Sequence, residues 1–102
     1  MRLARAFLAT IGLAVIVLLA SVAARAAPPP PGAASCSGCH ASSAGVATTV
    51  PRLAGRDAGE IVAAMQAFRA GKRPATVMDR IAKGFSVEET GAIAAWLAAQ
   101  KN

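Results

Sequence analysis

The stretch Cys36-Ser37-Gly38-Cys39-His40 contains both cysteines and the single histidine of the 102-residue chain. Two small residues separate the thiols, and the imidazole follows the second thiol directly. In this C-x-x-C-H spacing, the thiols add to the two vinyl groups of a c-type haem and the histidine binds its iron. The stretch therefore predicts one covalently bound haem c, attached at Cys36 and Cys39, with His40 as an iron ligand.

Three other uses of the two cysteines compete with haem attachment. A thioredoxin-like redox pair requires a βαβ pattern, and the sequence has no β-rich run of the required kind. A structural zinc site requires four ligands, whereas the chain has three Cys and His residues. A structural disulfide across so short a loop adds little stability and leaves His40 without a role. We therefore favour haem attachment.

Residues 1–26 are predicted to be a signal peptide. Arg2 and Arg5 precede an uncharged run over residues 6–24, and residues 24–26 form an Ala-Arg-Ala cleavage site. An uncleaved membrane anchor is the alternative, because an uncharged run of 19 residues nearly spans a bilayer. Residues 27–34 include four consecutive prolines and are predicted to be a Pro-rich spacer. Residues 35–102 then form a single small domain.

The basic charge of the chain belongs largely to this leader. Its removal takes away three of the 11 Lys and Arg residues and lowers the net charge from +6 to +3. No basic stripe with interleaved aromatic residues remains, so we expect no binding to nucleic acid. The rest of the chain is rich in alanine and poor in large apolar side chains. A domain of this size usually needs a disulfide, a metal or another staple, and a large apolar cofactor would also serve.

Two longer helices and one short helix are expected in the domain. Asp57 and Glu60 form a capping box that begins the first helix, and an apolar repeat continues it up to Gly71. Ser86 and Glu89 form a second capping box before the last helix. The apolar stripe of this last helix consists of Ile93, Trp96 and Leu97. The short helix is expected around Ile81 and Ala82.

A second iron ligand is predicted at Met78. Methionine is the soft donor left once His40 is used, and two methionines follow the leader. Met65 lies within the apolar repeat of the first long helix, where a core role explains it. Met78 follows Gly71 and Pro74, in a segment that can wrap around one side of a ring. The alternative for Met78 is a loop side chain that fills a gap.

These motifs together resemble class I c-type cytochromes over nearly all of residues 35–100. The resemblance rests on the CSGCH stretch, Pro51-Arg52-Leu53-Ala54-Gly55, Met78 and the capped last helix with its aromatic residue. It implies an all-α cytochrome c domain over residues 35–102, with helices wrapped around the attached haem. It also implies that Cys36 and Cys39 form the thioethers, that His40 is the proximal ligand and that Met78 is the distal ligand. Pro51 resembles the loop proline whose carbonyl receives the imidazole N–H.

A narrower likeness lies in residues 67–86, which include Phe68-Arg69-Ala70-Gly71-Lys72-Arg73-Pro74 and Ala82-Lys83-Gly84-Phe85-Ser86. This stretch is similar to the cytochrome subunit of flavocytochrome c sulfide dehydrogenase. The chain departs from that family before the haem motif, where the Pro-rich spacer leaves room for barely one helical turn. The departure makes a supporting partner chain more plausible.

The expected function is that of a periplasmic monohaem electron carrier and not of an enzyme. The resemblance implies a redox partner, with a flavoprotein sulfide dehydrogenase subunit as the specific candidate. Five cations around the predicted ligand loop form a basic rim that would steer an acidic partner: Arg69, Lys72, Arg73, Arg80 and Lys83. The alternative for these cations is an ordinary solvated charged face. The alternative function is a haem sensor or peroxidase-like enzyme with a displaceable distal ligand. The alternative location is the inner membrane, facing the periplasm, if the leader is retained.

Overall fold

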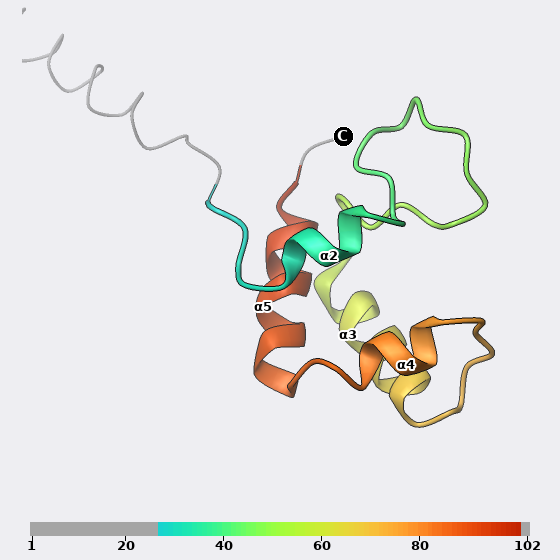
Figure 1. The fold of residues 1–102 in the computed structure, drawn as a ribbon. Coiled ribbons are helices and arrows are strands. Elements are labelled where there is room, and N and C mark those ends of the chain that lie inside the picture. Colours follow the sequence, from blue (N-terminus) through green and yellow to red (C-terminus); the bar gives the residue numbers. More distant parts are fainter. Residues whose placement is uncertain (1–26, 101–102) are drawn as a thin grey trace, which may run out of the picture.

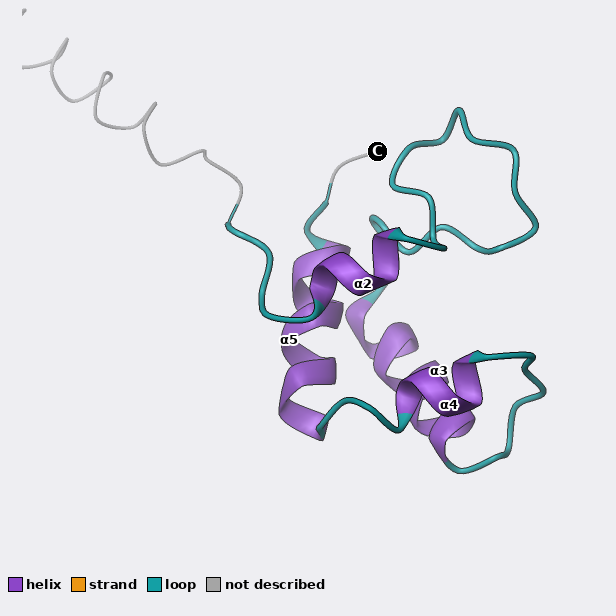
Figure 2. Ribbon diagram, in the orientation of Figure 1, coloured by secondary structure: helices purple, strands orange, loops and turns teal. Residues whose placement is uncertain are grey.

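The computed structural model describes residues 27–100, which form an all-α domain without a strand in that range. Its helices are α2 (Ala33–Ser37), α3 (Ala58–Arg69), α4 (Met78–Ala82) and α5 (Val87–Ala98), and Figure 2 shows loops of very different length between them. The prediction of an all-α fold is confirmed. The predicted signal peptide, residues 1–26, and residues 101–102 lie outside the described residues.

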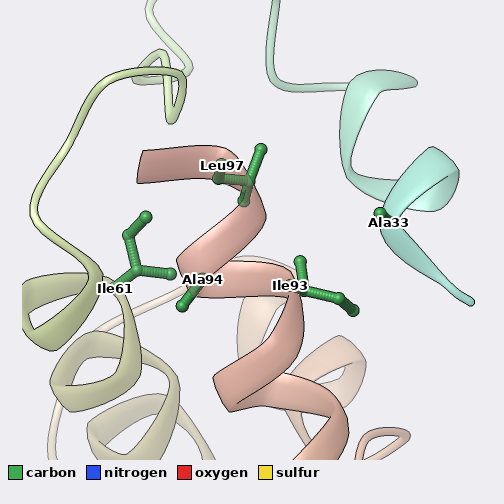
Figure 3. Close-up of a cluster of buried hydrophobic side chains, with 5 residues drawn as sticks. All are labelled: Ala33, Ile61, Ile93, Ala94 and Leu97. Carbon is green, nitrogen blue, oxygen red and sulfur yellow. The ribbon is translucent and has the colours of Figure 1, made fainter. Parts of the chain in front are cut away.

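The helix α3 packs against both α4 and α5. The buried cluster consists of Ala33, Ile61, Ile93, Ala94 and Leu97. Figure 3 shows Ile61 between α3 and α5, and Ala33 of α2 on the other side of α5. Because two of the five members are alanines, residues 27–100 bury little apolar volume by themselves. The predicted stripe of α5 is present, although Trp96 is only half-buried and Ala94 takes a fully buried place.

The helix α5 begins as predicted, with a complete capping box. The hydroxyl of Ser86 accepts a hydrogen bond from the backbone N–H of Glu89 at 3.1 Å. The Glu89 carboxylate accepts one from the Ser86 backbone N–H at 2.7 Å. Each bond satisfies a backbone donor that the first turn of a helix leaves without an intrahelical partner.

The helix α3 has only half of its predicted capping box. The Asp57 carboxylate accepts a hydrogen bond from the backbone N–H of Glu60 at 3.0 Å, but the described contacts do not include the return bond from the Glu60 side chain. Asp57 can cap the helix alone because aspartate is a strong N-cap residue. The end of α3 also agrees with the expectation, since the helix stops at Arg69, two residues before Gly71.

The short helix α2 begins inside the predicted spacer, at Ala33. Gly32, its N-cap residue, has φ +85°, a conformation that costs glycine little. A Cβ atom at this position would lie 2.8 Å from Cε1 of Phe85. Glycine therefore lets the Phe85 ring, which follows α4, approach the start of α2.

The helix α4 contains the expected Ile81 and Ala82 but begins three residues earlier, at Met78. Met78 is therefore the first residue of a helix, and the preceding loop ends at Val77. None of the helices between residues 27 and 100 is both long and apolar enough to cross a membrane.

Candidate haem-binding site

The last turn of α2 and the turn that follows it bring the two cysteines and the histidine onto one side. The backbone N–H groups of Cys39 and His40 both donate to the carbonyl of Cys36, at 3.3 Å and 2.9 Å. The chain thus continues to turn as a helix after Ser37. Residues separated by three and four positions share one face of a helical turn, so Cys36, Cys39 and His40 are presented together.

The two thiols have different surroundings. Cys36 is half-buried and packs against the core cluster, whereas Cys39 is exposed. Burial raises the pKa of the Cys36 thiol, because removal from water disfavours the charged thiolate. The two thiols are not joined in a disulfide. Neither sulfur is therefore committed to a disulfide, which leaves both for thioether bonds.

His40 is oriented by the backbone carbonyl of Pro51. Its Nδ1 atom lies 2.5 Å from the Pro51 oxygen. A carbonyl oxygen can only accept a hydrogen bond, so Nδ1 is the protonated nitrogen. The neutral ring then carries its lone pair on Nε2, which is the atom available to a metal. The structure thus brings His40 and Pro51 together in the arrangement that the resemblance implies.

The segment that carries Pro51 is itself fixed to the fold. The backbone N–H of Gly55 donates to the carbonyl of Leu97 in α5 at 3.0 Å, and a turn closes between Arg56 and Leu53 at 3.1 Å. Leu53 packs against the core cluster. These contacts hold the Pro51 carbonyl in place, and through it the orientation of the imidazole.

Met78 is the first residue of α4, whereas His40 follows α2, and Met78 lies outside the core cluster. It is half-buried, and its neighbours Val77 and Ile81 are 47% and 37% exposed. In Figure 1 the loop that follows α2 and the loop that enters α4 project to the same side of α3 and α5. Met65, in contrast, lines a small pocket between α3 and α5 together with Val62 and Thr90.

The residues of this site fit a haem in their chemistry. They offer two free thiols at the attachment spacing, an imidazole whose Nε2 is available and a partly exposed thioether. Val77 and Ile81, the exposed apolar neighbours of Met78, would also be covered by the flat apolar haem. The small core of residues 27–100 is consistent with a large cofactor that completes it. Cys36, Cys39, His40 and Met78 are thus the residues that would hold the haem.

Two of the three alternative uses of the cysteines, the zinc site and the thioredoxin-like pair, find no support in residues 27–100. Within residues 27–100, no group of three or more His, Cys, Asp and Glu side chains is arranged to hold a metal ion. The same part of the chain has no strand, whereas a thioredoxin-like pair requires a βαβ unit. The ligand roles of His40 and Met78 remain predictions.

The predicted basic rim divides into two groups. Arg69 donates to the carbonyl of Phe85 at 2.8 Å, and the guanidinium carbon of Arg73 lies 5.0 Å from the centre of the Phe68 ring. Lys72, Arg80 and Lys83 are exposed. The sequence analysis missed the contacts of the two arginines. An aromatic residue near an arginine is a weak signal for stacking, because the path of the intervening loop decides whether the groups meet.

The chain is similar to the cytochrome subunit of sulfide dehydrogenase from Chlorobaculum tepidum, with 38% identity over 60 residues. These residues are 59% of this chain and 54% of the relative, so the chain spans about half the length of the curated relative. No family model matches the chain. The similarity supports a distant relationship to c-type cytochromes.

Proposed function

We propose that this protein is a monohaem c-type cytochrome that transfers electrons. Cys36 and Cys39 would attach the haem, and His40 and Met78 would bind its iron. The hydrogen bond from His40 Nδ1 to the Pro51 carbonyl carries this proposal, because it leaves Nε2 free on the residue that directly follows the second thiol. When bound, the haem supplies a one-electron couple between Fe(III) and Fe(II).

The protein contributes orientation and ligand chemistry. The Pro51 carbonyl fixes the tautomer of His40 and makes its ring a better donor. The thioether of Met78 is a soft ligand that favours Fe(II) and raises the reduction potential relative to harder ligands. With both residues bound to the iron, no ligand position would be left for a substrate. The chain therefore works as an electron carrier and not as an enzyme that makes or breaks bonds.

The partner and the location extend this proposal. The curated relative is named as a subunit of sulfide dehydrogenase, which supports a redox partner of the same kind, with a flavoprotein subunit as the candidate. Haem attachment to thiols and the predicted signal peptide both favour the periplasm. The chain would be tethered to the inner membrane if residues 1–26 were retained.

The axial ligands are tested by Met78→Ala, with Met65→Leu as the matched control. Met78→Ala should abolish the methionine-to-iron absorption band of the oxidised protein, lower the reduction potential and allow cyanide to bind rapidly. Met65→Leu should keep the band, because a swap of similar volume in α3 costs less than about 1.5 kcal/mol. An unchanged band in Met78→Ala would refute Met78 as a ligand. Rapid binding of carbon monoxide by the wild type would instead favour the haem sensor or peroxidase-like enzyme.

The partner is tested by mild purification from the periplasmic or membrane fraction. If flavin absorption accompanies the haem and sulfide reduces both, the chain is the electron-accepting subunit of a sulfide-oxidising complex. If the haem appears alone and sulfide reduces it slowly, the chain is a general carrier and the flavoprotein assignment is wrong.

A further inference from the structure

The loop over residues 70–77 delivers Met78, and its middle is tied to α3 by a stacked arginine. We propose that Arg73 is a positioning residue for Met78: its guanidinium, stacked over Phe68, holds the loop and slows the release of the thioether from iron. This inference rests on the proposed function, in which Met78 binds the iron.

The first residues of the loop have a fixed path. Gly71 has φ +69°, a left-handed conformation that glycine adopts without a steric penalty. The backbone N–H of Gly71 donates to the Phe68 carbonyl at 3.1 Å, and that of Lys72 donates to the Ala67 carbonyl at 2.9 Å. This pair of bonds is a Schellman motif. It turns the chain back at the end of α3, so that Arg73 returns toward Phe68.

The middle of the loop depends on side-chain contact. In the described part of the chain, no backbone hydrogen bond begins or ends at residues 73–76. The exposed Arg73 lies with its guanidinium carbon 5.0 Å from the ring centre of the half-buried Phe68. A guanidinium at this distance from an aromatic face is attracted to the ring and can also stack on it. The contact therefore ties the loop to α3 where the backbone supplies no bond.

Only four residues separate Arg73 from Met78. The helix α4 that it begins has five residues, too few to be stable without its packing on α3. At its far end, Ala82 is buried, and Arg69 holds the carbonyl of Phe85. The far end of α4 is thus anchored independently of the loop. Arg73 is placed to control the near end, where Met78 lies.

The test measures how fast neutral imidazole displaces Met78 in the oxidised full chain with its haem attached. The readout is the loss of the methionine-to-iron absorption band. Arg73→Gln and Phe68→Leu should each speed displacement by about two- to fivefold, the range expected for one exposed cation–π contact. The double variant should be no faster than the single variants, because both changes remove the same contact.

Conservative and control variants separate stacking from charge and from general loss of structure. Phe68→Tyr keeps an aromatic face and should keep the wild-type rate. Lys72→Gln removes a neighbouring positive charge that stacks on no ring, and its rate should also stay unchanged. Circular dichroism should give the same helix content for all variants.

Two results would overturn the role of Arg73 but leave Met78 ligation intact. One is an Arg73→Gln variant with the wild-type rate of displacement by imidazole. The other is a double variant whose acceleration equals the product of the two single effects. A wild-type protein without the methionine-to-iron band would overturn Met78 ligation, and this inference with it. The two failures are therefore distinguishable in the same set of spectra.

Discussion

Trp96 of α5 donates its indole N–H to the carbonyl of Ala27 at 3.0 Å, across 69 positions of sequence. The bond ties the Pro-rich segment to the last helix. Pro28, Pro30 and Ala92 line an open groove beside the indole. The segment thus runs along α5. This hydrogen-bonded Pro-rich segment covers part of the last helix.

Trp96→Phe should destabilise the haem-loaded protein by about 1 kcal/mol, because the ring is largely kept and the bond to Ala27 is lost. The measurement is the free energy of unfolding from a denaturant titration. The same substitution in a chain shortened to begin at Pro28 should cost clearly less. An equal cost in both chains would mean that the effect comes from packing and not from the bond.

Gly32→Ala and Gly91→Ala should change stability in opposite directions. The first places a Cβ atom 2.8 Å from Phe85 at a φ of +85°, and should cost about 1–3 kcal/mol. Gly91 lies within α5, and apart from its chain neighbours and the backbone of its own helix, no atom of the described residues comes within 4 Å of an added Cβ. Its replacement should stabilise the protein by about 0.5–1 kcal/mol. Thermal unfolding measures the change in stability of each variant relative to the wild type. A Gly32→Ala protein as stable as the wild type would disprove the close packing of Phe85 against Gly32.

Ser86→Ala should lower the free energy of unfolding by about 1 kcal/mol, because it removes the side-chain acceptor for the backbone N–H of Glu89. Ser86→Thr keeps a hydroxyl acceptor and should lose much less. Chemical denaturation measures the free energy of unfolding of both variants. If the alanine and threonine variants have equal values, the capping box contributes little to the stability of α5.

Reversal of the two exposed cations Arg80 and Lys83 to glutamate should slow electron transfer with an acidic partner. At low ionic strength we expect the second-order rate constant to fall on the order of tenfold, because steering is lost. Salt screens exposed charges, so the difference should shrink in high salt. Stopped-flow mixing at several salt concentrations provides the measurement. Equal rates at low salt would show that these cations do not face the partner.

Local signals in the sequence predicted α3, α4 and α5, whereas the short helix α2 was not predicted. The capping box at Ser86 fixed the start of α5, and Ile81 with Ala82 indicated α4. These features depend on residues a few positions apart, where backbone geometry alone decides which groups meet. The first capping box was only half right, because the Glu60 side chain has no described bond back to Asp57.

Contacts between distant parts of the chain were less accessible to prediction. The approach of His40 to Pro51 was expected from a family resemblance and not from spacing, because an irregular loop of ten residues separates them. The stacking of Arg73 on Phe68 and the bond from Trp96 to Ala27 were not expected at all. Both depend on the path of segments without regular structure, which local propensity does not specify.

The hydrogen bond from Gly55 to the carbonyl of Leu97 also has a practical consequence. It makes the final turn of α5 part of the support for the loop that orients the imidazole. We therefore predict that a tag or fusion at the end of this turn shifts the reduction potential of the proposed haem as well as the solubility of the protein. Reduction potentials should therefore be compared between tagged and untagged protein before either value is assigned to the native chain.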